Sequence, residues 1–352
     1  MNKHILKFTL FFFASFFMLT SCNPDDPETE ELSVEEVQAE IETTFNAMTD
    51  CMQGFESGEF SDSVQDFFNI ANGEGDSEWA EYLTDQLEPF EMDLENFELS
   101  DHAGTYNWNN SSETWDYSDS PSDKLVFNFP FMEGSSNNNV TITLNSYEYQ
   151  QVMFDNETEY LPSQLNASIS VNNDVIFSVD LDNVIYNVGS DYTVPTNFDL
   201  EIITVPMTHT FSFDETSASN FSFDYSMHNN GMCATNFSAD FSLNTSDYTN
   251  ISDVEDFNMA SGLISHGDLE LQYSVDIDDL GALEEPTVTE INNFVSVDVY
   301  IASALVGELE YAEENNQSVV YIVFNDGTRE NVENYVGEEF TSQIETIFSN
   351  FL

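Results

Sequence analysis

Positively charged residues are almost absent from this chain. It has 4 Lys and Arg residues against 67 Asp and Glu residues, and its formal net charge is −63 at pH 7. A surface of this sign repels nucleic acid and anionic lipid headgroups, which excludes nucleic-acid binding. Few cations exist to form salt bridges, so counterions must screen the surface. We therefore expect stability to fall at low ionic strength.

Recognisable catalytic motifs are also lacking. There is no Gly-x-Ser-x-Gly elbow, no His-Glu-x-x-His zinc helix and no phosphate-binding glycine loop. The carboxylates are too numerous for spacing to identify a glycosidase pair. His228 and Cys233 are close in sequence, as a thiol nucleophile and its base would be, but no orienting group is identifiable. The sequence therefore predicts a protein that is not an enzyme. The scattered histidines are expected in strands and turns: His102, His209, His228 and His266.

No cofactor or dedicated metal site is predicted. Residues 276–281, Asp-Ile-Asp-Asp-Leu-Gly, look like a calcium loop. Leu280 occupies a ligand position, however, and Thr287 stands where an EF-hand has its twelfth-position glutamate. Acidic clusters on the surface are still expected to bind Ca²⁺ loosely.

Cysteine is scarce, with 3 in the chain: Cys22, Cys51 and Cys233. In an oxidising envelope, Cys51 and Cys233 can form a disulfide. Two buried free thiols are the alternative, since Cys51 lies in a helical pattern and its spacing gives no indication of a partner.

Residues 1–21 have the composition of a secretory signal peptide. Lys3 and Lys7 precede a short apolar run, which ends at Leu19-Thr20-Ser21-Cys22. A membrane span is the alternative, but it requires ~20 apolar residues and the run is shorter. Leu-Thr-Ser-Cys resembles the lipobox of bacterial lipoproteins. The resemblance implies that Cys22 becomes the lipidated first residue of the mature chain, which anchors it to a membrane and takes its formal charge to −65.

Residues 22–32 form an acidic, proline-containing tether that is expected to be extended. An acidic cluster after the lipidated cysteine is similar to the export signal of Bacteroidetes-type surface lipoproteins. This similarity implies an outer-membrane lipoprotein displayed on the cell surface. A plain solvated linker is the alternative.

Residues 33–90 show helical patterns. Ser33 and Glu36 match a capping box. Apolar residues then recur every three or four positions, as on one face of an amphipathic helix, until Gly54 and Gly58. Shorter helical patterns follow at 63–71 and 77–87.

Residues 104–325 alternate between apolar and polar side chains, as strands of a sheet with one solvated face do. About ten to twelve strands with short turns favour a large, curved, antiparallel sheet. Residues 328–352 return to helical spacing and predict a C-terminal helix. The expected fold is α+β, a half-barrel-like sheet packed by N-terminal and C-terminal helices, in a single domain over 33–352. Six phenylalanines line one face of these strands as candidate ligand-facing residues or as ordinary core: Phe211, Phe213, Phe221, Phe223, Phe237 and Phe241.

The lipobox and tether occur together with Gly-x-Tyr-x-Trp at 104–108, Phe-x-Phe-Pro at 127–130 and an Asp-Gly turn at 326–327. This combination resembles uncharacterised Bacteroidetes-type lipoproteins and implies a location without an activity. The expected architecture is also similar to the open half-barrel of LolA-like and LppX-like lipoprotein and lipid carriers. That similarity is one of architecture, which does not settle function.

Three functions follow as hypotheses. The first is a non-enzymatic binding or structural module on the envelope, with an envelope protein as its partner. The second is a carrier of a lipid or other hydrophobic small molecule between the sheet and the helices. The third is a carbohydrate-binding or carbohydrate-active protein, in which Trp108 and Trp115 stack on sugar rings.

Overall fold

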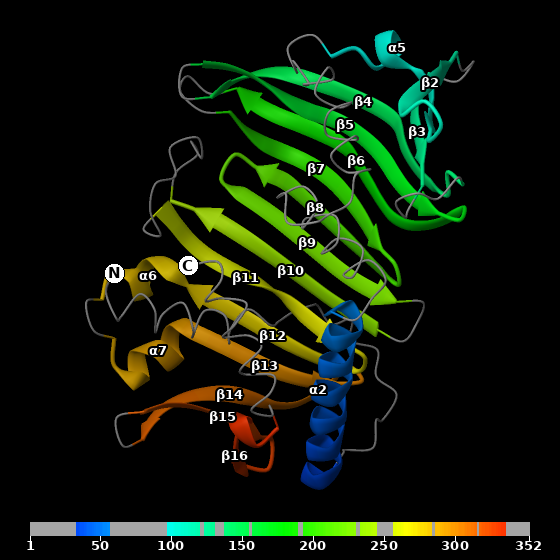
Figure 1. Ribbon diagram of the computed structural model, residues 1–352. Helices are drawn as coiled ribbons and strands as arrows, with labels where there is room; N and C mark the ends of the chain where they lie inside the picture. Colours follow the sequence, from blue (N-terminus) through cyan, green and yellow to red (C-terminus); the bar gives the residue numbers. More distant parts are fainter. Residues whose placement is uncertain are drawn as a thin grey trace. The chain divides into compact units, whose positions relative to one another are not determined.

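The computed structural model describes residues 33–56, 97–119, 123–130, 137–154, 157–188, 193–229, 233–244, 256–283, 286–314 and 317–335. Within these residues sixteen strands form one open sheet, in the order β16-β15-β14-β13-β12-β11-β10-β9-β8-β7-β6-β5-β4-β3-β1-β2 (Figure 1). The chain divides into two compact units. Unit 1 comprises residues 1–53 and 215–352, and unit 2 comprises residues 54–214.

Unit 2 holds long antiparallel strands. Strands β3 to β8 pair antiparallel in sequence order, each with the next. Strand β1 pairs parallel with β3 and antiparallel with β2. The elements are α5 (Leu99–His102), β1 (Gly104–Asn109), β2 (Thr114–Ser118), β3 (Leu125–Phe129), β4 (Val140–Phe154), β5 (Glu157–Val171), β6 (Asp174–Val188), β7 (Thr193–Thr204) and β8 (Met207–Ser217), whose last residues belong to unit 1.

Unit 1 combines antiparallel strands with helices. Its elements are α2 (Val34–Glu56), β9 (Asn220–Asn229), β10 (Cys233–Leu243), β11 (Phe257–His266), β12 (Leu269–Asp276), α6 (Ile277–Gly281), α7 (Val288–Phe294), β13 (Val295–Ile301), β14 (Ala304–Glu314), β15 (Gln317–Phe324), β16 (Arg329–Asn331) and the 3₁₀ turn η4 (Val332–Asn334). The expected fold class, α+β with a large curved antiparallel sheet, is confirmed.

Helices cover one face of the unit 1 strands near both strand ends (Figure 1). Helix α2 begins at the predicted capping box, where the Ser33 N–H donates to Glu36 at 2.9 Å. Its buried Val37 and Ile41 pack with strand residues that include Leu269 and Val299. At the other strand ends, α6 and α7 lie over a second buried cluster: Ala260, Tyr273, Val275, Ile277, Leu280, Val295 and Val297.

The core of unit 2 lies at its β1–β4 end. Leu125, Phe127 and Phe129 alternate along β3 with less buried residues and pack with Val140 of β4. Aromatic side chains of β1 and β2 surround this cluster, and Trp115 contacts the Phe127 ring edge to face at 5.4 Å between centroids. The alternation of the sequence therefore places the apolar side chains on one face, as predicted.

Two local predictions are wrong. The C-terminal helix does not begin at residue 328, because residues 329–331 form β16 and residues 332–334 form a 3₁₀ turn. The number of strands, expected as about ten to twelve, is sixteen among the described residues; one of the additional turns lies at Ala302 and Ser303, whose φ angles are 49° and 70°. The remainder of the predicted C-terminal helix and the helical patterns at 63–71 and 77–87 lie outside the described residues, as do the signal peptide and tether. The single domain over 33–352 stays a prediction.

Candidate functional site

The apolar face of β4–β8 in unit 2 is the candidate site. In the register of these strands, Tyr147 pairs with Leu165, Leu165 with Leu181, Leu181 with Leu200, and Leu200 with Phe211. Side chains of paired residues project to the same side of a sheet. Five adjacent strands thus contribute one row of apolar side chains. At about 4.8 Å between strands, the row is about 19 Å long.

Two parallel rows extend this face. One consists of Leu144, Ala167, Val179, Ile202 and His209, and the other of Ile142, Ile169, Phe177, Thr204 and Met207. None of the fifteen residues in the three rows is acidic or basic apart from His209. We call these three rows the ligand face.

The first row of the ligand face is less buried than the cores of either unit, whereas Thr204 and Met207 at the end of the third row are buried. Leu165, Leu181 and Leu200 are all partly exposed, whereas Leu125 and Phe127 in the core of unit 2 are buried. The surroundings are apolar enough to disfavour charge, because desolvation raises the pKa of Tyr147 at one end of the first row above its ordinary value. This arrangement can hold an apolar molecule, while the described part of the ligand face offers no acid or thiol for covalent chemistry.

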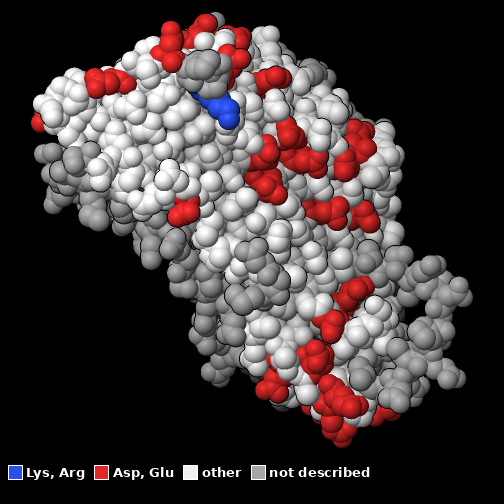
Figure 2. Space-filling view, turned by 90° about the vertical axis from the view of Figure 1, so that its right-hand side faces the viewer, with Lys and Arg blue, Asp and Glu red and all other residues white. Residues whose placement is uncertain are grey.

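The opposite face of the same strands is polar and acidic. Asp180 pairs with Glu201, and Asp182 pairs with Asp199. Amide groups approach two of these carboxylates: Gln164 donates to Asp182 at 2.9 Å, and Asn183 donates to Asp199 at 2.6 Å. On the face of the molecule seen in Figure 2, acidic side chains gather in several groups with little basic surface among them.

The six predicted phenylalanines occupy the apolar side of their strands, in both units. In unit 2, Phe211 ends the first row of the ligand face, and Phe213 stacks on Phe198 at 5.8 Å between centroids. In unit 1, Phe221 is buried and pairs with Phe241. Phe223 contacts Phe237 at 5.8 Å between centroids. The prediction missed the aliphatic members of the ligand face, although the alternation of 165–171 and 175–181 indicated them.

The two described tryptophans pack against each other and against the core. Trp108 and Trp115 meet edge to face with 5.5 Å between their centroids, and Trp115 also contacts Phe129 edge to face. Their rings are therefore not coplanar, whereas a flat sugar-stacking platform requires coplanar rings. Trp79 lies outside the described residues.

Cys233 is disulfide-bonded and buried. It therefore has no free thiol to act as a nucleophile with His228. Because the chain has only two other cysteines, its partner is Cys22 or Cys51. Pairing with Cys51 stays a prediction. Cys22 lies outside the described residues, so its lipidation stays a prediction.

The calcium-like segment forms α6, and Asp276 is its N-cap, accepting the Asp279 N–H at 3.1 Å. Among the described residues no group of three or more His, Cys, Asp or Glu side chains could hold a metal ion. Loosely bound Ca²⁺ stays a prediction. None of the described helices has the length and hydrophobicity needed to cross a membrane.

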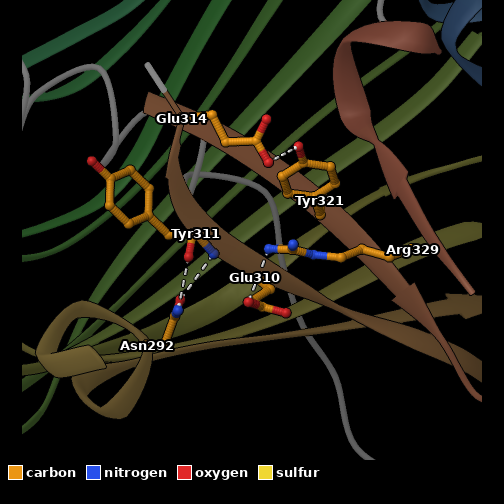
Figure 3. Close-up of polar contacts among 6 residues, drawn as sticks. All are labelled: Asn292, Glu310, Tyr311, Glu314, Tyr321 and Arg329. Carbon is orange, nitrogen blue, oxygen red and sulfur yellow. Dashed lines mark hydrogen bonds and ion pairs between the residues drawn. The ribbon is translucent and has the colours of Figure 1, made fainter. Parts of the chain in front are cut away.

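A polar cluster surrounds the single arginine of the chain at the β14–β16 edge of unit 1 (Figure 3). Arg329 donates to Glu310 at 3.0 Å, and Tyr321 donates to Glu314 at 2.7 Å. Asn292 of α7 bonds both backbone groups of Tyr311 in β14, accepting its N–H at 2.9 Å and donating to its carbonyl oxygen at 2.8 Å. These contacts attach β16 and α7 to the sheet, which is a structural role.

Comparison with known proteins gives no relative: no family model, no curated protein and no solved structure matches this chain.

Proposed function

We propose that this chain is a lipid-anchored lipoprotein of the bacterial outer membrane that acts as a non-enzymatic binding module. The lipobox ending at Cys22 and the acidic tether after it support this location. Two or more acyl chains on Cys22 hold a protein stably on a membrane, since each buried methylene contributes roughly 0.8 kcal/mol. The molecule would then work where it is anchored, on the envelope.

The ligand proposed for this module is hydrophobic, and one observation carries the proposal. Leu165, Leu181 and Leu200 continue an uncharged row across adjacent strands and remain partly exposed. A row about 19 Å long is comparable to an extended acyl chain. A contiguous row of apolar side chains that stays partly exposed can bind a partner or ligand. If the protein is instead a purely structural or protein-binding module, these rows are ordinary core.

Native mass spectrometry tests the hydrophobic ligand directly. The mature chain, residues 22–352 with Cys22→Ser to omit the lipid, would be purified from an envelope extract without detergent. A co-purifying mass of lipid size that is lost on gentle unfolding is the expected result. A clean apo mass, together with no binding of added lipid, would overturn the carrier function and leave the structural module.

Substitutions on the two faces of the same strands locate the ligand. Leu181→Asp and Leu200→Asp each place a charge in the first row of the ligand face and should abolish the co-purifying mass. Ser212→Asp is the matched control, because Ser212 pairs with Asp199 on the polar face. Loss of the ligand in Ser212→Asp as well would show that the ligand face is not the binding site. Circular dichroism verifies that each variant is folded.

The anchor has its own test. Metabolic labelling with palmitate should mark the wild-type protein and leave Cys22→Ser unlabelled. Unlabelled wild-type protein would contradict the lipoprotein assignment, whatever the outcome for the hydrophobic ligand.

A further inference from the structure

Strand β2 is the last strand of the sheet in unit 2, and its outer edge is unpaired (Figure 1). Among the described residues β2 pairs with β1 alone, over Thr114–Ser118. Four of its five residues are exposed, and Tyr117 has 52% of its surface exposed. The outer edge of such a strand presents backbone N–H and C=O groups that can pair with another strand.

The β2 edge lacks the features that usually protect a terminal strand. Its sequence, Thr-Trp-Asp-Tyr-Ser, contains no proline and no lysine, and its register with β1 runs without a bulge. Threonine, tryptophan and tyrosine are also residues that favour strands. The edge is therefore a suitable template for an added strand.

The charge around the β2 edge favours a cationic partner. Residues 113–124 contain four acidic residues and one basic residue, all exposed: Glu113, Asp116, Asp119, Asp123 and Lys124. A second copy of this chain would bring the same negative charge to the edge. Such pairing is disfavoured, because like charges opposite one another on paired strands repel.

The two faces of β2 differ, and this difference sets the sequence pattern of the partner. On the polar face, Asp116 pairs with Asn107 and accepts a hydrogen bond from the neutral Asn109 amide at 2.9 Å, which leaves its charge uncompensated. On the other face, Trp115 pairs with Trp108 beside the core of unit 2. An added strand would place alternate side chains next to the carboxylate and next to the aromatic rings.

We propose that the β2 edge binds an extended protein segment of alternating basic and apolar residues, which joins the sheet as a further strand. Backbone hydrogen bonds supply the affinity, and the alternate side chains supply the specificity. Basic side chains lie next to Asp116, and apolar ones continue the row of Trp108 and Trp115. This binding surface depends neither on the hydrophobic ligand nor on the lipid anchor.

The experiment uses the mature chain with Cys22→Ser and a short peptide of alternating lysine and valine, acetylated and amidated at its ends. We expect saturable binding in isothermal titration calorimetry and slower amide hydrogen exchange at residues 114–118 in the complex. A peptide of the same composition, with its lysines and valines in two separate blocks, is the control for charge attraction alone and should bind more weakly. The alternating peptide with N-methylated backbone amides should lose binding, because it cannot donate backbone hydrogen bonds.

Two substitutions that change the net charge equally locate the site. Asp116→Lys should weaken binding of the alternating peptide by roughly fivefold, because it replaces attraction at the edge by repulsion. Asp174→Lys should leave binding unchanged, since Asp174 is exposed in β6, five strands away from β2. Asp116→Asn, which keeps an acceptor for the Asn109 amide, carries the test if Asp116→Lys does not fold.

Several outcomes would overturn the proposal. These are no binding of the alternating peptide, equal binding of the block peptide, or unchanged hydrogen exchange at residues 114–118 in the saturated complex. Equal effects of Asp116→Lys and Asp174→Lys would show that net charge, and not the β2 edge, attracts the peptide. A wild-type dimer in light scattering that excludes the peptide would identify a second copy as the occupant of the edge and would contradict a cationic partner.

Discussion

The guanidinium carbon of Arg329 lies 3.9 Å from the centre of the Tyr321 ring. This cation–π contact joins the short edge strand β16 to β15, where Arg329 pairs with Val323 and Tyr321 pairs with Asn331. The same guanidinium donates to Glu310 of β14 at 3.0 Å. In a chain with 4 cationic residues, one of them thus connects three neighbouring strands.

Replacing Arg329 should lower stability modestly. Arg329→Gln removes the cation–π contact and the ion pair, whose side chains are 38% and 42% exposed, so we expect a loss of about 1 kcal/mol in urea unfolding. Lys124→Gln is the control, because it changes the net charge equally and Lys124 has no ion pair with a described residue. Equal losses in the two variants would show that net charge, and not the local contact, is responsible.

A methyl group at Gly262 should be strongly destabilising. Its Cβ would overlap the Ser238 carbonyl oxygen and lie 2.6 Å from the Tyr273 hydroxyl, inside the paired strands β10–β12. We expect Gly262→Ala to cost roughly 1–3 kcal/mol, the range for overpacking. Gly281→Ala is the matched control, since among the described residues no atom beyond its chain neighbours and its own helix backbone lies within 4 Å of its Cβ. Alanine also favours helix more than glycine does. A similar midpoint for both variants in urea would contradict this packing.

The sequence indicates a turn where the turn residues are of a type common in turns. It does not indicate a turn whose residues are of other types. Asn172 and Asn173 have φ angles of 55° and 75°, which asparagine tolerates, so the residue types themselves indicate this hairpin. Ala302 and Ser303 adopt similar angles, and neither residue type signals such a turn. Only the register of β13 and β14 shows that two strands lie there.

Helix α7 was missed although its signal was present. Thr287 and Glu290 form a capping box, with Glu290 N–H donating to Thr287 Oγ1 at 3.3 Å. The spacing is the same as that of Ser33 and Glu36, which predicts the start of α2. At the ligand face, alternation predicted which side is apolar. It could not predict which residues face one another across strands, because register depends on turns and bulges.

Acid should weaken the structure through His266. Burial lowers the pKa of His266 below its ordinary value. The unfolded chain therefore binds a proton at a higher pH than the folded protein does, and stability falls as the pH decreases below about 6.5. We expect the thermal midpoint of the wild type to fall between pH 7.5 and 5.5, and His266→Gln to show a smaller fall. Identical pH profiles for the wild type and His266→Gln would remove His266 as the cause.

The disulfide of Cys233 should link it to Cys51. Peptide mapping without reduction should yield one cross-linked pair from residues near 51 and 233, and Cys51→Ala should free the Cys233 thiol for alkylation. The loss of such a crosslink typically costs about 2–4 kcal/mol. Cys22→Ala is the control and should leave the crosslink intact. A crosslink that disappears in Cys22→Ala instead would identify Cys22 as the partner and contradict its lipidation.

Low salt should destabilise this protein more than it does most proteins. Like charges directly opposite on paired strands repel, as do Asp180 with Glu201 and Asp182 with Asp199. Raising NaCl from about 0.01 M to about 1 M shortens the Debye length from about 30 Å to about 3 Å, which screens this repulsion. We expect the thermal midpoint to rise across that range, and Glu201→Gln to raise it at low salt while reducing the salt dependence.

Sucrose separates charge screening from general stabilisation by excluded solutes. At equal osmolality, sucrose should raise the midpoint less than NaCl does, because it carries no charge. If the midpoint rises equally in both, or stays constant from low to high NaCl, self-repulsion does not limit stability. The charge of −63 would then be compensated by ions held at specific positions, and dialysis against a chelator should reveal them as a lower midpoint.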